Sequence, residues 1–500
     1  MLLLCLLLST ANAAERGTTV NTDAGAIEGS AKGGVISFKG IPYAAPPVGQ
    51  LRWREPQPVA KWSGTRRADT FGKACMQKPG LSAENGGEPG ELSEDCLTLN
   101  VWTPALSPSA KLPVIVWIHG GAFVFGAGSV PIYDGAAMAK KGAVFVSINY
   151  RLGPLGFFAH PALDKGKSGG PYNLGMLDQV AALKWVKANI AKFGGDAADI
   201  TLMGQSAGGK SVLWHFASPL SRGLFHKGIA ESVYILPDAK LDKGREVSSK
   251  IASAVGLDGA NASLDDLRKV SADRFFDIAD KDAALGPVGI VGDAMLPRSI
   301  AETFQAGSEA RLPLIIGNTS NDSSVIAAFG VSPEEIMKKL GAAGFALKLL
   351  YPGVPADEMP AQALRDIVFT MNSRWVADRH AKRAPTWRYY FDYVAEKNRP
   401  KWKDGVPHGG EIIYFLDTVD SSYAERDREY ARKASGYMLQ FAKTGKPAFA
   451  GSPEWRDDRV LRDRTLVFGQ DKIEQRSNFM KVRLDVLMGV TKIVDSLFGK

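Results

Sequence analysis

The stretch that decides the fold is Ile200–Lys210, ITLMGQSAGGK, near the middle of a chain of 500 residues. An apolar run, ITLM, is followed by a serine with glycine two residues before and after it, and then by KSVLWHFA, which is typical of a helix. Strand, sharp turn and helix in this order favour a nucleophile elbow, in which the serine is held in a strained conformation. We predict that Gly204 and Gly208 give the neighbouring strand and helix room, and that Ser206 is a nucleophile. The alternative is a glycine-rich turn with an incidental serine.

Apolar runs alternate with longer amphipathic stretches on both sides of this turn. Nearly continuous apolar runs indicate strands buried on both faces, and their alternation with helices indicates a mostly parallel, covered sheet. No linker rich in Pro, Gly or Ser divides the pattern, so we expect one large α/β domain. The predicted strands are Val114–Ile118, Ala143–Ile148, Ile200–Met203, Leu312–Ile316 and Arg388–Val394, and the predicted helices are Asn173–Ile190, Ser324–Leu340 and Tyr423–Lys443.

The net charge of the chain is +8, and its basic residues are scattered among acidic ones, as in YAERDREYARK. This mixture indicates a solvated surface of both signs rather than a basic stripe, so we expect no nucleic-acid partner.

The N-terminus, MLLLCLLLSTANAAERG, has the features of an export signal. Its apolar run Leu2–Leu8 is too short to span a bilayer, and Ala11-Asn12-Ala13 matches a small-x-small cleavage site. We predict a signal peptide over residues 1–13 and an exported domain over residues 14–500, periplasmic or secreted, with no stable membrane anchor. A buried N-terminal strand or helix is the alternative.

Cleavage there would remove Cys5 and leave only Cys75 and Cys96. An even pair of cysteines in an exported protein favours one disulfide, which would contribute about 3 kcal/mol in the chain-entropy model. Two unpaired core thiols are the alternative.

A second glycine-rich turn follows the predicted strand Val114–Ile118, in the sequence His119–Phe123 (HGGAF). An HGG loop of this kind supplies backbone N–H groups to an oxyanion hole, together with the residue after the nucleophile. We therefore predict that Gly120, Gly121 and Ala207 bind the oxyanion. A hairpin or phosphate-binding turn is the alternative, but no G-x-x-x-x-G-K-[ST] motif is present.

The base and acid should follow the serine in the order acid, then histidine. Of the six histidines only His380 and His408 lie late enough. His380 lies in VADRHAKR, for which we expect a solvated helix face, whereas His408 lies in the turn DGVPHGGEI, which suits a base on a loop. Asp322, just past the strand Leu312–Ile316, is the predicted acid, and a solvated loop aspartate is the alternative. Asp293, in VGDAMLP, is a poorer candidate for the acid.

Taken together, these motifs resemble the type-B carboxylesterase/lipase family, the cholinesterase-like branch of the α/β-hydrolases. The resemblance extends over nearly the whole mature chain. It implies an α/β-hydrolase fold with a mostly parallel mixed sheet flanked by helices, and hydrolysis of carboxylic esters by a Ser-His-acid triad without metal or cofactor. The motifs that carry it are Phe38–Trp53, Glu94–Trp102, Pro113–Phe123, Asn149–Phe158, Asn173–Asp196, GQSAGG and Leu439–Pro447.

The resemblance also implies roles for individual residues. It assigns Ser206 as nucleophile, His408 as base, and a disulfide between Cys75 and Cys96. It further implies that Ser232, in AESVY, supports the triad by hydrogen bonding, although Val233 stands where the family usually has glycine.

Three departures from the family are informative, and the last two bear on the substrate. The family acid is normally glutamate, whereas this chain has Asp322, and the residue before the nucleophile is often glutamate, whereas this chain has Gln205. The segment Met76–Asp95 contains no aromatic residue, although relatives that bind choline esters place a tryptophan there to attract a quaternary ammonium. We therefore expect neutral or anionic esters to be favoured over choline esters.

The expected partners are a small ester and water, and we favour a monomer. Two other functions stay open at this point. One is an inactive binding or adhesion protein on the same scaffold, which the presence of Ser206, His408 and Asp322 argues against. The other is an amidase, lactonase or polyester-degrading enzyme, because leaving-group preference depends on the shape of the pocket.

Overall fold

A computed structural model describes residues 18–80, 87–164, 170–234, 238–279, 286–328, 332, 348–458 and 463–498 of the chain. Within these residues eleven strands form one sheet, in the order β16-β15-β14-β13-β12-β11-β9-β10-β8-β4-β3. The strands from β15 to β10 are parallel to their neighbours, and the antiparallel pairs lie at the two edges. The expected mostly parallel mixed sheet is therefore confirmed.

The strands of this sheet have the following bounds: β3 Ser30–Lys32, β4 Val35–Pro42, β8 Thr98–Thr103, β9 Leu112–Ile118, β10 Val144–Ile148, β11 Gly195–Gln205, β12 Lys227–Glu231, β13 Leu314–Thr319, β14 Thr386–Phe391, β15 Arg464–Phe468 and β16 Ile473–Ser477. The helices used below are α3 Leu174–Asn189, α4 Ala207–Ala217, α8 Ile300–Ala306, α9 Ser324–Ala328, α13 Met371–His380, α14 Ile412–Phe415, α15 Glu425–Thr444 and α16 Lys481–Phe498.

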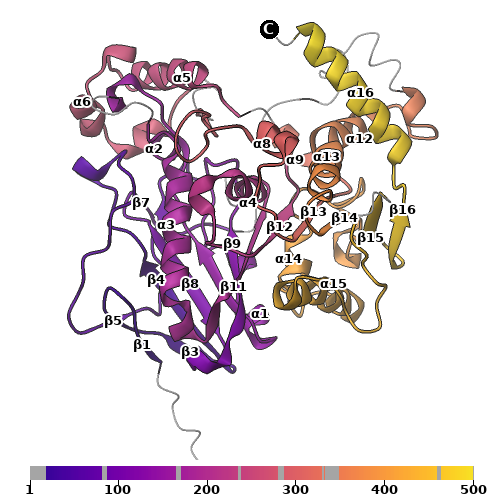
Figure 1. The fold of residues 1–500 in the computed structure, drawn as a ribbon, viewed down its shortest axis with the longest axis horizontal. Coiled ribbons are helices and arrows are strands. Elements are labelled where there is room, and N and C mark those ends of the chain that lie inside the picture. Colours follow the sequence, from indigo (N-terminus) through magenta and orange to yellow (C-terminus); the bar gives the residue numbers. More distant parts are fainter. Residues whose placement is uncertain are drawn as a thin grey trace, which may run out of the picture.

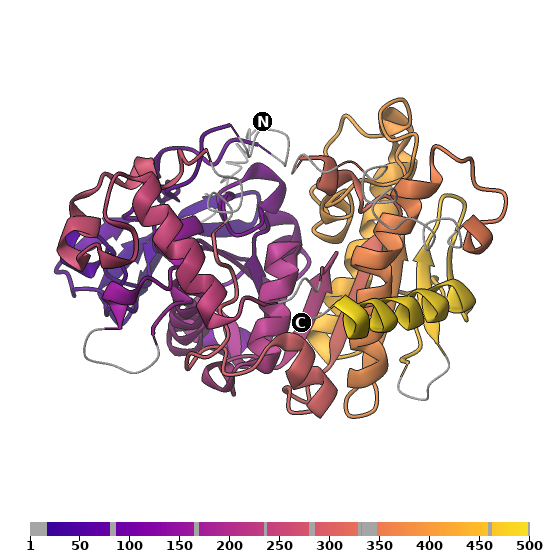
Figure 2. The ribbon, with the colours of Figure 1, turned by 90° about the horizontal axis from the view of Figure 1, so that it is seen from above.

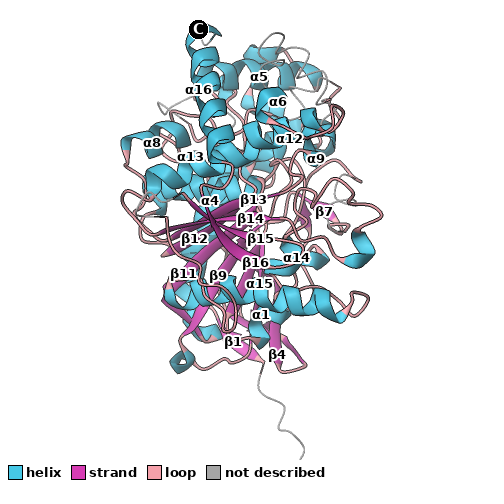
Figure 3. Ribbon diagram, turned by 90° about the vertical axis from the view of Figure 1, so that its right-hand side faces the viewer, coloured by secondary structure: helices cyan, strands magenta, loops and turns pink. Residues whose placement is uncertain are grey.

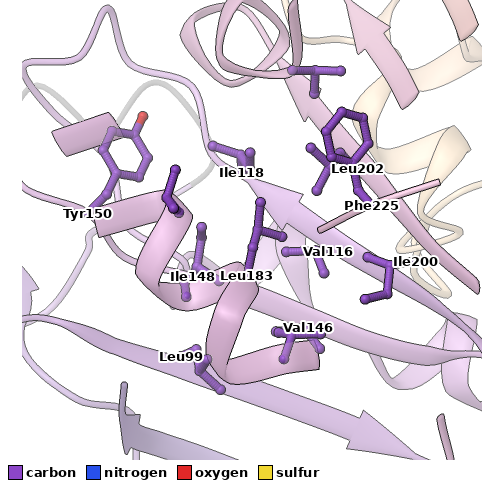
Figure 4. Close-up of a cluster of buried hydrophobic side chains, with 14 of the residues drawn as sticks. Leu99, Val116, Ile118, Val146, Ile148, Tyr150, Leu183, Ile200, Leu202 and Phe225 are labelled. Atoms are coloured by element: carbon purple, nitrogen blue, oxygen red, sulfur yellow. The ribbon is translucent and has the colours of Figure 1, made fainter. Parts of the chain in front are cut away.

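Helices cover both faces of the sheet (Figure 3). Successive side chains of a strand point to opposite faces, so each buried strand contributes to two cores. Val116 and Leu202 pack with Leu183 of α3 on one face (Figure 4). Trp117 and Met203, their neighbours in sequence, pack with residues of α15 on the other face. This double burial explains why these strands read as continuous apolar runs.

The N-terminal and C-terminal halves of the chain lie side by side along the sheet. The indigo-to-magenta half carries β9, β11 and α4, and the orange-to-yellow half carries β14, β15 and α13 (Figure 1). The view from above shows the same division, with α16 lying across the C-terminal half (Figure 2). The central strands β11, β12 and β13 therefore bring together residues from both halves.

All five predicted strands are confirmed, as β9, β10, β11, β13 and β14, and their observed bounds differ from the predicted ones by at most five residues at either end. The helix predicted over Asn173–Ile190 is α3, and the one predicted over Tyr423–Lys443 is α15. The helix predicted over Ser324–Leu340 begins at Ser324 as α9, and nearly all of its remainder lies outside the described residues.

Cys75, at the end of the short strand β6 (Ala74–Cys75), is joined to Cys96 by a disulfide bond. The predicted signal peptide, residues 1–13, lies outside the described residues. In the part of the chain that the structure describes, no helix combines the length and apolarity needed to cross a membrane.

Candidate active site

Ser206 lies in the tight turn between β11 and α4. Its φ of 58° and ψ of −120° place it outside the regions that L-residues favour, and it occupies the N-cap position of α4. A strained residue of this kind persists only when its surroundings hold it. One such contact is the Ser206 N–H, which donates to the backbone oxygen of Glu231 at the end of β12, at 2.8 Å.

The glycines on either side of Ser206 are required by close backbone packing. A Cβ on Gly204 would lie 2.6 Å from the carbonyl of Gly208 and 2.7 Å from the oxygen of Ile118. A Cβ on Gly208 would collide with the oxygen of Ile118, the last residue of β9. The predicted steric role of both glycines is thus confirmed, and it lets the start of α4 lie directly on β9.

The glycine loop after β9 lies against Ser206. A Cβ on Gly120 would be 3.2 Å from the Cβ of Ser206, and Gly121 has a φ of 110°. His119 holds the loop, because its Nδ1 lies 2.8 Å from the oxygen of Gly120 and its own carbonyl accepts a bond from Tyr150. Burial lowers the pKa of His119 to about 4, so the ring is neutral and can donate from Nδ1. Ala207, fully buried, begins α4 beside this loop.

His408 and Asp322 form a hydrogen-bonded pair close to this turn. His408 Nδ1 lies 2.7 Å from Asp322 Oδ1, and Asp322 Oδ2 accepts the N–H of Thr319 at 2.9 Å. Asp322 is fully buried, which excludes the solvated loop aspartate. Among the described residues the buried His408 Nε2 has no hydrogen-bond partner, so no protein group occupies its lone pair.

The two loops that carry this pair are hydrogen-bonded to each other, although His408 and Asp322 are 86 residues apart in the sequence. Asn321 forms a bridge with Pro407, and its N–H donates to Val406 O at 2.8 Å. The N–H of His408 donates to Ser324 Oγ at 2.9 Å, at the start of α9. These bonds fix the imidazole relative to the carboxylate before any substrate arrives.

The remaining candidates for base and acid have structural roles. His380 is fully buried, with Nδ1 3.1 Å from Glu309 Oε1 and Nε2 2.8 Å from Leu312 O. The expectation of a solvated helix face was therefore wrong, because α13 turns that face toward α8 and β13. Asp293 accepts four backbone N–H bonds, from Tyr172, Asn173, Met295 and Leu296, as expected of a structural residue.

Gln205 and Ser232 both lie close to the pair but do not bond to it. A Cβ on Gly120 would be 3.0 Å from Gln205 Oε1, and one on Gly409 would be 3.5 Å from its Nε2. Gln205 thus lies between the glycine loop after β9 and the loop that carries His408. Ser232 Oγ donates to Glu411 Oε1 at 2.8 Å, so its bond reaches the His408 loop three residues past the histidine.

Two buried glutamates were missed in the sequence. Glu411 and Glu231 are both fully buried, and among the described residues neither oxygen of Glu231 has a hydrogen-bond partner. Burial raises the pKa of both carboxyls, and the charge of Asp322 raises that of Glu411 further, to about 8. The only sequence signal was their proximity to His408 and Ser232.

The raised pKa of Glu411 predicts a pH-dependent stability. A carboxyl with a raised folded pKa stabilises the fold below its ordinary value of 4.5 and loses that contribution as the pH rises to about 8. The glutamine of Glu411→Gln cannot ionise, so the variant does not lose this contribution. Its free energy of unfolding minus that of wild type should therefore increase between pH 5 and pH 8, by at most about 1.4 kcal/mol per pH unit. Urea unfolding at both pH values measures this, with the exposed Glu88→Gln as control. Parallel pH curves for wild type and Glu411→Gln would contradict it.

Ser206 lies strained in a strand-to-helix turn of an eleven-stranded sheet, beside a glycine loop. A histidine paired with an aspartate lies on a nearby loop. This arrangement is that of an α/β-hydrolase of the serine type. The model of the Carboxylesterase family matches residues 16–344 and 356–482 of this chain. The chain belongs to that family, and it is a carboxylic ester hydrolase.

Individual relatives cover most of the chain. It is 33% identical over 456 residues to the para-nitrobenzyl esterase of Bacillus subtilis (strain 168), covering 86% of this chain and 90% of that protein. It is 33% identical over 466 residues to the fumonisin B1 esterase of Sphingopyxis macrogoltabida, covering 87% and 83%. A solved structure of PNB esterase superposes with a TM-score of 0.80 at 30% identity, over 94% of this chain and 100% of that one.

Proposed function

We propose that this chain hydrolyses carboxylic esters through an acyl-enzyme on Ser206, with His408 as base and Asp322 as the orienting acid. The observation that carries the proposal is the 2.7 Å contact between His408 Nδ1 and Asp322 Oδ1, together with an Nε2 that has no hydrogen-bond partner among the described residues. A neutral imidazole bonded in this way carries its proton on Nδ1 and a lone pair on Nε2.

The reaction runs in two halves. His408 Nε2 takes the Ser206 proton as Oγ attacks the ester carbonyl, and it returns that proton to the leaving alcohol. Water then attacks the acyl-enzyme by the same route. The N–H groups of Gly120, Gly121 and Ala207 stabilise the oxyanion, each contributing roughly 3 kcal/mol to the transition state. Asp322 holds the tautomer and stabilises the imidazolium.

Neutral or anionic esters are the proposed substrates. Gln205 is a neutral residue where a glutamate would attract a cation, and the segment between Cys75 and Cys96 carries no aromatic side chain. Two relatives are a para-nitrobenzyl esterase and a fumonisin B1 esterase, and neither name refers to a choline ester.

We also propose that the chain is exported, with residues 1–13 as signal peptide. Support comes from the apolar run and cleavage pattern of the N-terminus and from the disulfide between Cys75 and Cys96, since disulfides persist in oxidising compartments. N-terminal sequencing of the protein recovered from the medium or periplasm tests this, and an uncleaved cytosolic product would refute it.

The activity itself is tested with purified wild type on p-nitrophenyl esters from acetate to long acyl chains. A p-nitroanilide, a lactone and a polyester film are measured alongside to separate esterase from amidase, lactonase and polyesterase. We expect rapid ester hydrolysis and a fluorophosphonate adduct on the peptide that contains Ser206. Absence of both would overturn the proposal.

The charge preference is tested by comparing acetylcholine with its uncharged analogue 3,3-dimethylbutyl acetate. Wild type should favour the uncharged ester, because the site offers no buried carboxylate at position 205. Gln205→Glu should raise kcat/KM for acetylcholine relative to the analogue about tenfold, as one charge contact of roughly 1.4 kcal/mol would do. A wild type that favours acetylcholine would refute the preference.

A further inference from the structure

A groove runs along helix α3, and we refer to it as the α3 groove. Its volume of about 790 Å³ lies within the range of small-molecule binding sites. Leu177, Ala181, Trp185 and Ala188 line it, and they follow one another at spacings of four, four and three residues, so they share one face of the helix. From Leu177 to Ala188 the helix rises by roughly 16 Å, so the groove is elongated.

The α3 groove presents apolar side chains that are not fully covered. Leu177, Ala181 and Trp185 are only partly buried, and Leu220, which also lines the groove, is 40% exposed. Residues 56–59, with the sequence PQPV, add two prolines and a valine to the lining. A long apolar surface of this kind suits the body of an aliphatic ligand, which would remove it from water.

Two lysines provide cations at the α3 groove. Lys61 and Lys184 both line it, and both are exposed. In the part of the chain that the structure describes, neither lysine forms an ion pair with an acidic side chain. Both ammonium groups are therefore available to an anion bound in the groove.

The acidic residues of the groove do not balance these lysines. Asp23 is paired with Lys192, at 2.6 Å, and Asp293 is occupied by its four bonds from backbone N–H groups. Glu55 is exposed and is the one acidic residue of the lining that has no ion-pair partner among the described residues. Two unpaired cations against one unpaired anion favour a negatively charged ligand.

The α3 groove is separate from the candidate active site. Neither Ser206 nor His408 lines it. Leu220, in its lining, lies past the C-terminal end of α4, whereas Ser206 caps the N-terminal end, and α4 is roughly 16 Å long. A ligand in the groove would therefore not take the place of a substrate at Ser206.

We infer that the α3 groove is a second ligand site, which binds a medium-chain fatty acid with its alkyl chain along α3 and its carboxylate beside Lys61 and Lys184. Burial of the alkyl chain against the apolar lining favours binding, and the two ammonium groups attract the carboxylate. A cationic head group would be repelled by the same lysines. The inference does not rest on the proposed function, because no step of it involves Ser206.

Trp185 offers a readout that is confined to the groove. The acid 11-bromoundecanoate carries a bromine atom at the end of its chain, and bromine quenches indole fluorescence only at short range. The chain has ten tryptophans, so the quenching due to Trp185 is the difference between wild type and Trp185→Phe. We expect saturable quenching in wild type and the loss of most of it in Trp185→Phe.

The role of the lysines is tested by titrating wild type and variants with dodecanoate as a competitor of the brominated acid. Lys61→Glu/Lys184→Glu should raise the Kd of dodecanoate about tenfold, the effect of losing two exposed charge contacts. Lys187→Glu is the matched control, because Lys187 is an exposed lysine of the same helix that bonds to Gly223 O and does not line the groove. Its Kd should equal that of wild type. Dodecyltrimethylammonium should bind wild type more weakly than dodecanoate does.

Two results would overturn the inference. One is quenching that Trp185→Phe leaves unchanged, and the other is a Kd that changes less than about threefold in Lys61→Glu/Lys184→Glu, with its fold checked by thermal unfolding. The titrations are repeated with Ser206→Ala, which should bind dodecanoate as wild type does. Binding is thus measured without ester hydrolysis, so failure of the proposed esterase activity and failure of this site are separate results.

Discussion

Ser206→Ala is expected to lower kcat for p-nitrophenyl butyrate by about 10⁴- to 10⁶-fold, because no acyl-enzyme can form without the hydroxyl. The variant should fold normally, since the backbone of the turn and its bond to Glu231 O are kept. Initial rates with active-site titration measure the loss, and a thermal unfolding curve checks the fold.

The matched control is Ser211→Ala, the same change on the same helix. Ser211 is fully buried and its Oγ accepts a bond from Gln179 at 3.1 Å, on the face of α4 turned toward α3. The Ser211→Ala variant should have a lower free energy of unfolding than wild type and should keep most of the wild-type kcat. The double variant Ser206→Ala/His408→Ala should have nearly the same kcat as Ser206→Ala, because the two residues act as one unit. If Ser206→Ala kept wild-type turnover, another nucleophile would have to exist.

Asp322→Asn is expected to lower kcat about 10⁴-fold through the wrong histidine tautomer. The N–H of Thr319 donates to Asp322 Oδ2, so in the variant the amide oxygen would remain there. The amide NH₂ would then face His408 Nδ1 and donate to it. Nδ1 would have to accept, the ring proton would move to Nε2, and the base would be lost.

Asp322→Glu should retain more activity than Asp322→Asn, since it keeps the charge and the acceptor. Asp293→Asn serves as a control, because that carboxylate binds four backbone N–H groups and should affect unfolding rather than kcat. The pH dependence of kcat/KM for each variant measures the outcome. Full activity in Asp322→Asn would place the orienting acid elsewhere.

Local chemistry made part of the site predictable. The turn at Ser206 needs glycine at 204 and 208, and those glycines are needed because β9 and α4 touch there. The glycine loop at Gly120 follows its strand directly. Each of these features is specified within a few residues, so the sequence alone could indicate it.

The relations between distant loops depended on the tertiary structure. Nothing in VADRHAKR separates a solvated His380 from the observed one, whose ring is buried against Glu309. Nothing in AESVY or HGGEI indicates that Glu231 and Glu411 lie buried together behind the site. Which side chains meet is decided when distant segments pack.

The sequence by itself thus determined the fold and the glycine-flanked turn at Ser206, because strand, turn and glycine requirements are local. The tertiary structure decided which titratable groups lie together: Asp322 with His408, and Glu231 with Glu411. The physical reason is the parallel sheet. It brings the carboxyl ends of β9, β11, β12 and β13 to one edge, and the loops that follow them converge there from positions up to about two hundred residues apart.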